Sequence, residues 1–235
     1  YIDSTPLTLF HSETEFVQEQ YSDELRYAGS FGDLDITTGL YWFEQELQYT
    51  EDRLIPASFA AGKFYGGGAM DHSVYGVFAQ ADYNFTDDFV GIFGLRWSRE
   101  EKDADVTYIR PRPECSVVDG TCPTTGTNPF IPGEPNGFSD GDTWENWTPR
   151  VGFQYFYGDT TQFYGNYTKG FRSGGYNFRI TDYNVFQNIV NMTGSPGFDE
   201  EEVDSFELGM KWETADGKGQ VNTAVFFTDV QNMQR

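Results

Sequence analysis

Residues 75–85 read Tyr-Gly-Val-Phe-Ala-Gln-Ala-Asp-Tyr-Asn-Phe, with an apolar or aromatic residue at every odd position. The even positions between them are small or polar, apart from Phe78. Alternation with a period of two is typical of a β-strand whose two faces meet different surroundings. The stretch therefore predicts a strand with one apolar face and one more polar face.

The same alternation recurs along the chain, and no long segment shows the period of an α-helix. We expect almost no helix and eight strands, at residues 15–28, 34–49, 72–85, 89–102, 144–157, 161–171, 203–214 and 220–231. These strands are longer than the about five or six residues that are usual in soluble sheets. They are long enough for a tilted strand to span a bilayer.

The connections between the expected strands alternate in length. Four are short, at residues 29–33, 86–88, 158–160 and 215–219, and three are long, at residues 50–71, 103–143 and 172–202. Outer-membrane β-barrels have short periplasmic turns and long extracellular loops. The pattern predicts an all-β, antiparallel transmembrane barrel segment with both chain ends on the extracellular side. A complete barrel of this type is expected to begin and end in the periplasm, so we expect a piece of a larger barrel.

The composition separates this chain from several other classes of protein. Aromatic residues make up 18% of the chain, although the mean hydropathy is only −0.56. Disordered acidic chains are poor in aromatic residues, and a net charge of −22 argues against the basic face that nucleic-acid binding requires. No apolar run is long enough for a transmembrane helix. The chain opens at Tyr1, and no signal peptide is recognisable.

Only two cysteines occur, Cys115 and Cys122, in a stretch rich in Pro, Gly and Thr. Their proximity predicts a local disulfide, formed in an oxidising compartment. A metal site is not expected, because two cysteines are an incomplete ligand set and His11 and His72 lie far away in sequence. No pairing of nucleophile and base stands out, so we expect neither an enzyme nor a bound cofactor.

Several segments resemble the barrel of the TonB-dependent receptor family. Residues 163–177, Phe-Tyr-Gly-Asn-Tyr-Thr-Lys-Gly-Phe-Arg-Ser-Gly-Gly-Tyr-Asn, resemble the family's Tyr-Ala-Ser-Tyr-Ser-Lys-Gly-Phe-Lys-Ser-Gly-Gly-Phe-Asn. Residues 201–211, Glu-Glu-Val-Asp-Ser-Phe-Glu-Leu-Gly-Met-Lys, are similar to its Pro-Glu-x-Val-x-Ser-Tyr-Glu-Leu-Gly-Leu-Lys. Residues 21–26 resemble Phe-Ser-Gln-Glu-Leu-Arg, and residues 86–97 contain a counterpart of Thr-Asp-x-Leu followed by Gly-Leu-Arg-Tyr. These motifs cover nearly the whole chain in the family's order.

The resemblance implies both an architecture and a function. Residues 1–235 would be part of a barrel of about 22 strands, without the plug domain and energy-coupling segment that precede the barrel in this family. The protein would lie in the bacterial outer membrane, in contact with lipid, as a receptor that binds and imports a scarce nutrient. Family members carry mostly ferric siderophores, and also haem, cobalamin or glycans, and they depend on the TonB complex.

Cargo contacts are expected on the long loops. Four loop arginines are candidates to bind an anionic iron chelate: Arg110, Arg112, Arg172 and Arg179. Tyr176 is a candidate to stack on a ring of the cargo, as are Tyr65 and Tyr183. The three glycines at residues 66–68 are expected to form a flexible loop tip. The Ser-Asp-Gly-Asp-Thr run at residues 139–143 is expected to form a solvated acidic loop rather than a Ca²⁺ site.

Three other functions remain open. A passive, porin-like channel would have no plug domain encoded upstream of the barrel. A soluble or secreted all-β binding protein, such as a lectin or adhesin, would be monodisperse without detergent. A surface protein assembled from barrel fragments of several chains would show a larger mass in its native complex.

Overall fold

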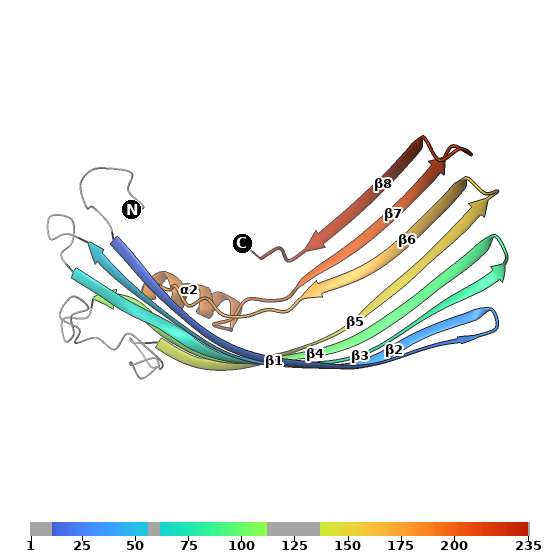
Figure 1. Cartoon of the computed structure of the whole chain (residues 1–235). Coiled ribbons are helices and arrows are strands. Elements are labelled where there is room, and N and C mark those ends of the chain that lie inside the picture. Colours follow the sequence, from blue (N-terminus) through green and yellow to red (C-terminus); the bar gives the residue numbers. More distant parts are fainter. Residues whose placement is uncertain (1–10, 56–61, 112–136, 235) are drawn as a thin grey trace.

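The computed structural model describes residues 11–55, 62–111 and 137–234, and the strands in these ranges form one antiparallel sheet (Figure 1). The strands are β1 (His11–Phe31), β2 (Leu34–Ile55), β3 (Gly62–Thr86), β4 (Phe89–Pro111), β5 (Gly137–Tyr157), β6 (Thr161–Arg172), β7 (Glu201–Glu213) and β8 (Gln220–Gln231), and helix α2 (Tyr183–Thr193) lies between β6 and β7. Each strand pairs with its neighbours in sequence, so β1 and β8 form the two edges of the sheet.

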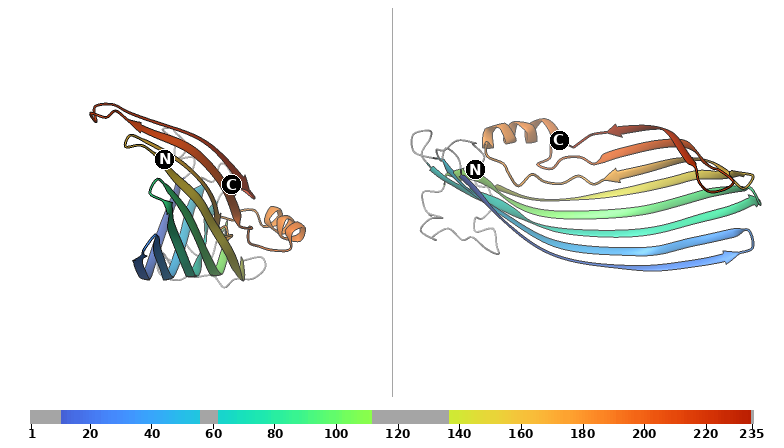
Figure 2. Two further views of the ribbon diagram at one scale, coloured as in Figure 1. Left: turned by 90° about the vertical axis from the view of Figure 1, so that its right-hand side faces the viewer. Right: turned by 45° about the horizontal axis from the view of Figure 1, so that its top comes forward.

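All eight expected strands are present, which confirms the prediction of a long-stranded antiparallel sheet. The four short turns lie together at one end of the sheet, as the alternation of connection lengths predicts (Figure 1). The sheet twists and curves from β1 to β8, as Figure 2 shows. The total of about 22 strands remains a prediction.

The strands extend further toward the long-loop end than the sequence alternation predicts. The pairing between β2 and β3 is continuous from Leu34 opposite Tyr83 to Ile55 opposite Gly62, so the connection between them is residues 56–61. Likewise, β4 ends at Pro111. Backbone hydrogen bonding therefore continues well beyond the part of each strand in which apolar and polar residues alternate regularly.

The predicted glycine loop tip at residues 66–68 is wrong, because these residues lie inside β3. Gly67 has a φ of 148° at a register shift between β3 and β4. A Cβ atom on Gly67 would lie 1.9 Å from the carbonyl oxygen of Tyr49, so only glycine permits this approach. The neighbouring Tyr65 is 1% exposed within the same strand rather than on a loop. The expected acidic loop at residues 139–143 is also wrong, since it is part of β5.

Cross-strand pairing assigns the side chains to two faces of the sheet. Val77 pairs with Trp97, and Trp97 pairs with Trp147, so these three side chains share one face. Exposed apolar side chains continue this face across the sheet: Leu25, Leu40, Val77, Leu95, Val151, Leu208 and Val225. This belt of exposed apolar groups is what contact with lipid requires.

The opposite, concave face carries charged and polar side chains. The guanidinium of Arg96 lies 5.3 Å from the centre of the Tyr41 ring, and the ammonium of Lys211 lies 5.3 Å from the Tyr164 ring centre. Such cation–ring contacts hold charges against the wall without a carboxylate partner. The concave face therefore suits an aqueous interior, and α2 lies on this side of the sheet (Figure 1).

Helix α2 lies in the connection that the sequence alternation predicts to be a plain loop. Its N-cap is Asp182, whose carboxylate accepts from the Val185 N–H at 3.1 Å. Its C-cap is Gly194 in the left-handed region, and the Gly194 N–H donates to the Val190 carbonyl at 2.7 Å. Both caps are sequence signals for a helix, so α2 could have been predicted from this spacing.

Replacing Asp182 with alanine is expected to destabilise α2 by about 1 kcal/mol, because the first turn loses the acceptor for one N–H group. Hydrogen exchange of the amides in α2, measured on the full-length protein, would show this as reduced protection. Asp182→Asn is the control, because its side-chain oxygen still accepts a hydrogen bond. Equal loss of protection in both variants would contradict a capping role.

Candidate functional site

The connection between β6 and β7, residues 173–200, folds back onto the concave face near the long-loop end of the sheet (Figure 1). We call it the β6–β7 segment. Its backbone joins β4 directly, because the Ile109 N–H donates to the Ile180 carbonyl at 2.8 Å. A bridge between Gly175 and Phe198 closes the segment on itself. The segment is thus an ordered part of the wall and carries α2 with it.

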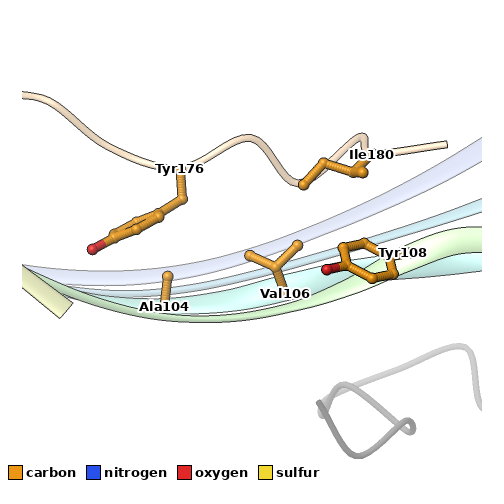
Figure 3. Close-up of a cluster of buried hydrophobic side chains, with 5 residues drawn as sticks. All are labelled: Ala104, Val106, Tyr108, Tyr176 and Ile180. Carbon is orange, nitrogen blue, oxygen red and sulfur yellow. The ribbon is translucent and has the colours of Figure 1, made fainter. Parts of the chain in front are cut away.

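An apolar cluster fixes the segment to β4. Five side chains that are each at most 9% exposed form its centre in Figure 3: Ala104, Val106, Tyr108, Tyr176 and Ile180. Aromatic rings extend the cluster: the Tyr108 ring lies 5.5 Å from Tyr183 and 5.8 Å from Phe186, and Phe186 stacks on Phe138 at 5.4 Å. Tyr183, predicted as a ligand-stacking residue, therefore packs against the wall.

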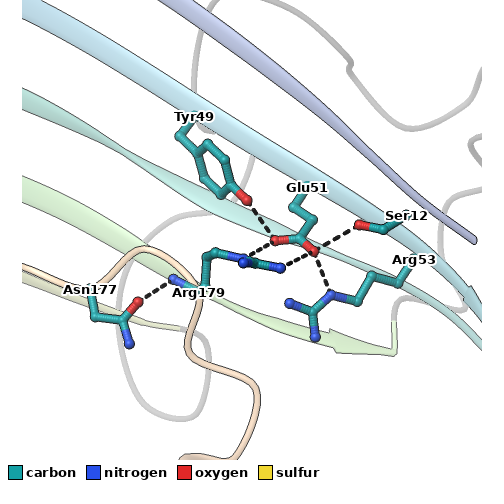
Figure 4. A network of polar contacts seen from close by, with 6 residues as sticks. All are labelled: Ser12, Tyr49, Glu51, Arg53, Asn177 and Arg179. Carbon is teal, nitrogen blue, oxygen red and sulfur yellow. Dashed lines mark hydrogen bonds and ion pairs between the residues drawn. The ribbon is translucent and has the colours of Figure 1, made fainter. Parts of the chain in front are cut away.

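A polar network fixes the segment to β2 (Figure 4). Its centre is Glu51, whose side chain is 0% exposed. Arg179 of the segment donates to both carboxylate oxygens, from Nε at 2.8 Å and Nη2 at 3.2 Å. Arg53 donates at 2.6 Å, and the hydroxyls of Tyr49 and Ser12 donate at 2.6 and 2.9 Å. The buried carboxylate is thus fully satisfied, and its partners come from β1, β2 and the segment.

The network keeps Glu51 ionised. Burial by itself raises the pKa of Glu51, but hydrogen bonds from Arg53, Arg179 and the two hydroxyls outweigh burial and hold the pKa well below its usual range. Because the folded pKa is depressed, the stabilisation is present above the unfolded pKa of about 4.3 and is lost as the pH falls through the lower folded value. The attachment of the segment is therefore insensitive to pH near neutrality.

A second polar attachment holds the start of the segment. The Lys102 ammonium donates to Ser173 Oγ at 2.8 Å and to the Gly174 carbonyl at 2.7 Å. Ser173 in turn donates to the Glu100 carboxylate at 2.6 Å, which also lies 3.1 Å from His72 Nε2. The chain therefore leaves β6 in a defined direction, toward the interior.

A cavity of about 840 Å³ opens between the segment, α2 and the residues that follow β8. Its lining includes Arg172, Tyr176, Phe186 and Phe198. The side-chain amide of Gln234 donates to the carbonyls of Ser173 and Asp199, both at 3.0 Å, which closes one side. Its lining combines apolar and aromatic side chains with charged and amide groups, and such a concave space can hold a small molecule.

The convex face also carries a hollow, of about 850 Å³. It is lined almost entirely by apolar groups, including Phe85, Phe93, Val151, Phe206 and Phe227. These residues belong to the exposed apolar face rather than to the charged, concave one. The hollow therefore suits hydrocarbon, and the cavity beside α2 is the better candidate for a polar or charged ligand.

The structure brings two of the predicted cargo residues together, because Arg172 and Tyr176 line the same cavity. Arg179 pairs with Glu51 instead, and Arg110 is a half-buried residue of β4. Three predicted residues lie outside the described part of the chain: Arg112, Cys115 and Cys122. The disulfide and the cargo-binding roles stay predictions.

Sequence reasoning missed Glu51 and Lys102, the two residues that attach the segment to the wall. Each is a polar residue at a long-loop end, and nothing in its local sequence marks a partner far along the chain. Within residues 11–55, 62–111 and 137–234, no three His, Cys, Asp or Glu side chains are arranged to hold a metal ion. In the same ranges, no helix is both long and apolar enough to cross a membrane.

Asp52 provides a pH-dependent prediction at the long-loop end of β2. Burial raises its pKa to about 6, helped by the Glu13 carboxylate, and its buried Oδ1 has no hydrogen-bond partner among the described residues. A raised folded pKa stabilises the fold below the unfolded pKa of about 4, and this stabilisation is lost as the pH rises through 6.

Asp52→Asn is therefore expected to stabilise the protein by about 1–2 kcal/mol at pH 7.5 and to have little effect near pH 4. Urea unfolding of the full-length protein at the two pH values would measure this difference. A gain of the same size at both pH values would contradict the titration of Asp52 as its cause.

Comparison with known proteins gives a family and a fold. Residues 3–235 match the family described as TonB dependent receptor-like, beta-barrel. The ferric yersiniabactin uptake receptor FyuA from Yersinia pestis is similar, with a TM-score of 0.70 and 19% identity over 97% of this chain and 31% of that chain. The siderophore receptor PiuA from Acinetobacter baumannii has a TM-score of 0.60 and 14% identity, over 91% and 32%. The copper transporter OprC has a TM-score of 0.60 and 13% identity, over 94% and 31%.

At these identities the solved structures establish the fold and not the ligand. This chain spans about 31% of the length of FyuA. Most of each related structure therefore has no counterpart in these residues.

Proposed function

Because this chain belongs to the TonB-dependent receptor β-barrel family, we propose that it forms part of the wall and the extracellular mouth of a receptor that binds and imports an iron complex. Members of this family are outer-membrane transporters, so the exposed apolar face contacts lipid and the concave face lines the interior. The long-loop end is then extracellular. One observation carries the proposal: a cavity at this end, beside α2, combines a cation with aromatic rings.

The wall residues have binding and positioning roles and no chemical step. Arg172 supplies positive charge, and Tyr176 and Phe198 supply ring surface for a bound cargo. The attachments at Glu51 and Lys102 hold the segment so that these groups face one space. A preformed site of this kind needs little ordering when the cargo binds.

The proposal of an iron complex is supported by the names of similar structures. FyuA is a ferric yersiniabactin uptake receptor and PiuA is a siderophore receptor. A copper transporter has the same fold, so copper is the specific alternative. Energy coupling would come from a TonB complex, acting through a part of the protein that is N-terminal to the barrel in this family.

The test is uptake by cells that express the full-length protein as their only receptor of this kind. We expect radioactive iron to accumulate from a ferric chelate, and accumulation to stop when TonB is deleted. Copper uptake in place of iron uptake would show that the cargo contains copper rather than iron. Equal passage of small sugars with or without TonB would support a porin-like channel instead.

A further inference from the structure

Arg172 is the cation in the cavity lining that is available to bind a ligand. It is exposed, and among the described residues no carboxylate lies within ion-pair distance of its guanidinium. Among the described residues, the cations that attach the segment to the wall are already paired. Arg179 and Arg53 bind Glu51, and Lys102 is held by Ser173 and Gly174.

Negative charge lies in the cavity and next to residues that line it. Asp199 lines the cavity, and its carboxylate has no ion-pair partner in the described part of the chain. The Tyr176 hydroxyl lies 3.1 Å from the Asp140 carboxylate, and the Gln234 N–H donates to the Glu201 carboxylate at 2.9 Å. Burial, reinforced by Asp140, raises the pKa of Tyr176, so its hydroxyl stays neutral. Arg172 therefore shares the cavity with the Asp199 carboxylate and lies opposite Glu201 in the pairing of β6 with β7.

The remaining lining is mainly apolar. Five apolar side chains line the cavity: Ile189 and Phe186 from α2, Pro196 and Phe198 from the end of the segment, and Met233 after β8. Ile189 belongs to an exposed apolar stripe of α2 with Val185 and Met192. Burying such groups favours a ligand with an apolar or aromatic body. The amides of Asn177 and Asn232 add neutral hydrogen-bonding groups.

We propose that the cargo is a metal chelate of low net charge, zero or minus one, with a substantial apolar or aromatic body, and that Arg172 is its charge-recognising residue. This inference rests on the proposed function and narrows its substrate class. A single negative group can pair with Arg172 while the body of the chelate covers Phe198 and Ile189. Further negative charges would lie near Asp199 and Glu201 without a partner, where like charges repel.

A series of three hexadentate ferric chelates of similar size tests the charge. Three catecholates give a net charge of minus three, one catecholate with two hydroxamates gives minus one, and three hydroxamates give zero. Dissociation constants would be measured by quenching of tryptophan fluorescence in the purified, detergent-solubilised full-length receptor. We expect the chelates of charge minus one and zero to bind at least about tenfold more tightly than the tris-catecholate.

Variants distinguish a direct contact between Arg172 and the chelate from a general effect of charge in the cavity. Arg172→Gln should weaken the chelate of charge minus one about tenfold and the neutral chelate less than about threefold. Asp199→Asn should improve binding of the tris-catecholate. Lys218→Gln, in the turn at the opposite end of the sheet, is the matched control and should change nothing. Heat-modifiable migration on gels confirms that each variant is folded.

Three outcomes would overturn this inference. Tightest binding of the tris-catecholate, or an equal effect of Arg172→Gln on all three chelates, would contradict the proposed class and leave the receptor function standing. Failure of every ferric chelate to bind, together with absence of iron uptake in cells, would overturn the proposed function as well.

Discussion

Replacing Glu51 with glutamine is expected to release the β6–β7 segment from β2, at a cost of about 2–4 kcal/mol in local stability. The Glu51 side chain is 0% exposed, and Arg53, which is 16% exposed, would lose its partner in a largely buried position. Removing one member of a buried ion pair is costly because the other charge remains desolvated. Hydrogen exchange of the backbone amides in residues 175–182 of the full-length receptor would report the loss.

The matched substitution on the other side of the pair should be much milder. Arg179→Gln leaves Glu51 with Arg53 and two hydroxyl donors, and the lost side chain is 58% exposed. The expected cost is below about 1 kcal/mol, because Arg179 is largely exposed and Glu51 keeps its other donors. Equal losses of protection in the two variants would contradict the assignment of Glu51 as the centre of the attachment.

Val151→Arg is expected to destabilise the barrel by about 2–4 kcal/mol, the range for a cation on the lipid face near the bilayer midplane. Val151 is 47% exposed and lies between Phe93 of β4 and Tyr167 of β6 on the apolar face. Its chain position in β5, six residues above the turn end at Tyr157, places it within the expected membrane belt. Urea-dependent folding of the full-length receptor into lipid vesicles would measure the change.

Gln154→Arg is the control on the same strand. Gln154 pairs with Val90 and Tyr164 on the concave face, so an arginine there remains in water and should change the stability by no more than about 0.5 kcal/mol. An equal cost for both substitutions, or a larger one for Gln154→Arg, would show that the two faces are assigned wrongly.

The strands could be predicted from sequence wherever one face meets lipid and the other meets water. Residues 75–85 alternate because Val77, Ala79 and Ala81 lie on the apolar face and Gln80 and Asp82 on the concave one. Beyond the membrane belt both faces meet water or other protein, so the alternation disappears although the strands continue. For this reason, residues 50–55 and 66–71 resemble loops in sequence but pair in register.

The site could be predicted only in part. Arg172 and Tyr176 were recognisable as a cation and a ring on a long loop, and they line one cavity. Glu51 was not, because its partner Arg179 lies 128 residues away in sequence. Tyr65 resembled a loop residue because three glycines follow it, yet those glycines allow strands to approach closely. The positions of these residues depend on contacts between distant parts of the chain, and local sequence patterns do not reveal such contacts.

The attachments explain how a long extracellular connection can present a defined surface. An apolar cluster, the Glu51 network and Lys102 hold the segment at three places on the wall. Each place draws on a different interaction, so no single substitution is expected to detach the whole segment. Arg172 and α2 then occupy fixed positions at the mouth.

The most direct test is a structure of the full-length receptor with the ferric chelate of charge minus one. We predict that the chelate lies in the cavity beside α2, with an acidic group paired to Arg172 and its apolar body against Phe198 and Ile189. A chelate bound elsewhere in the barrel, with this cavity empty and Arg172 in water, would contradict the assignment of the mouth as the cargo site.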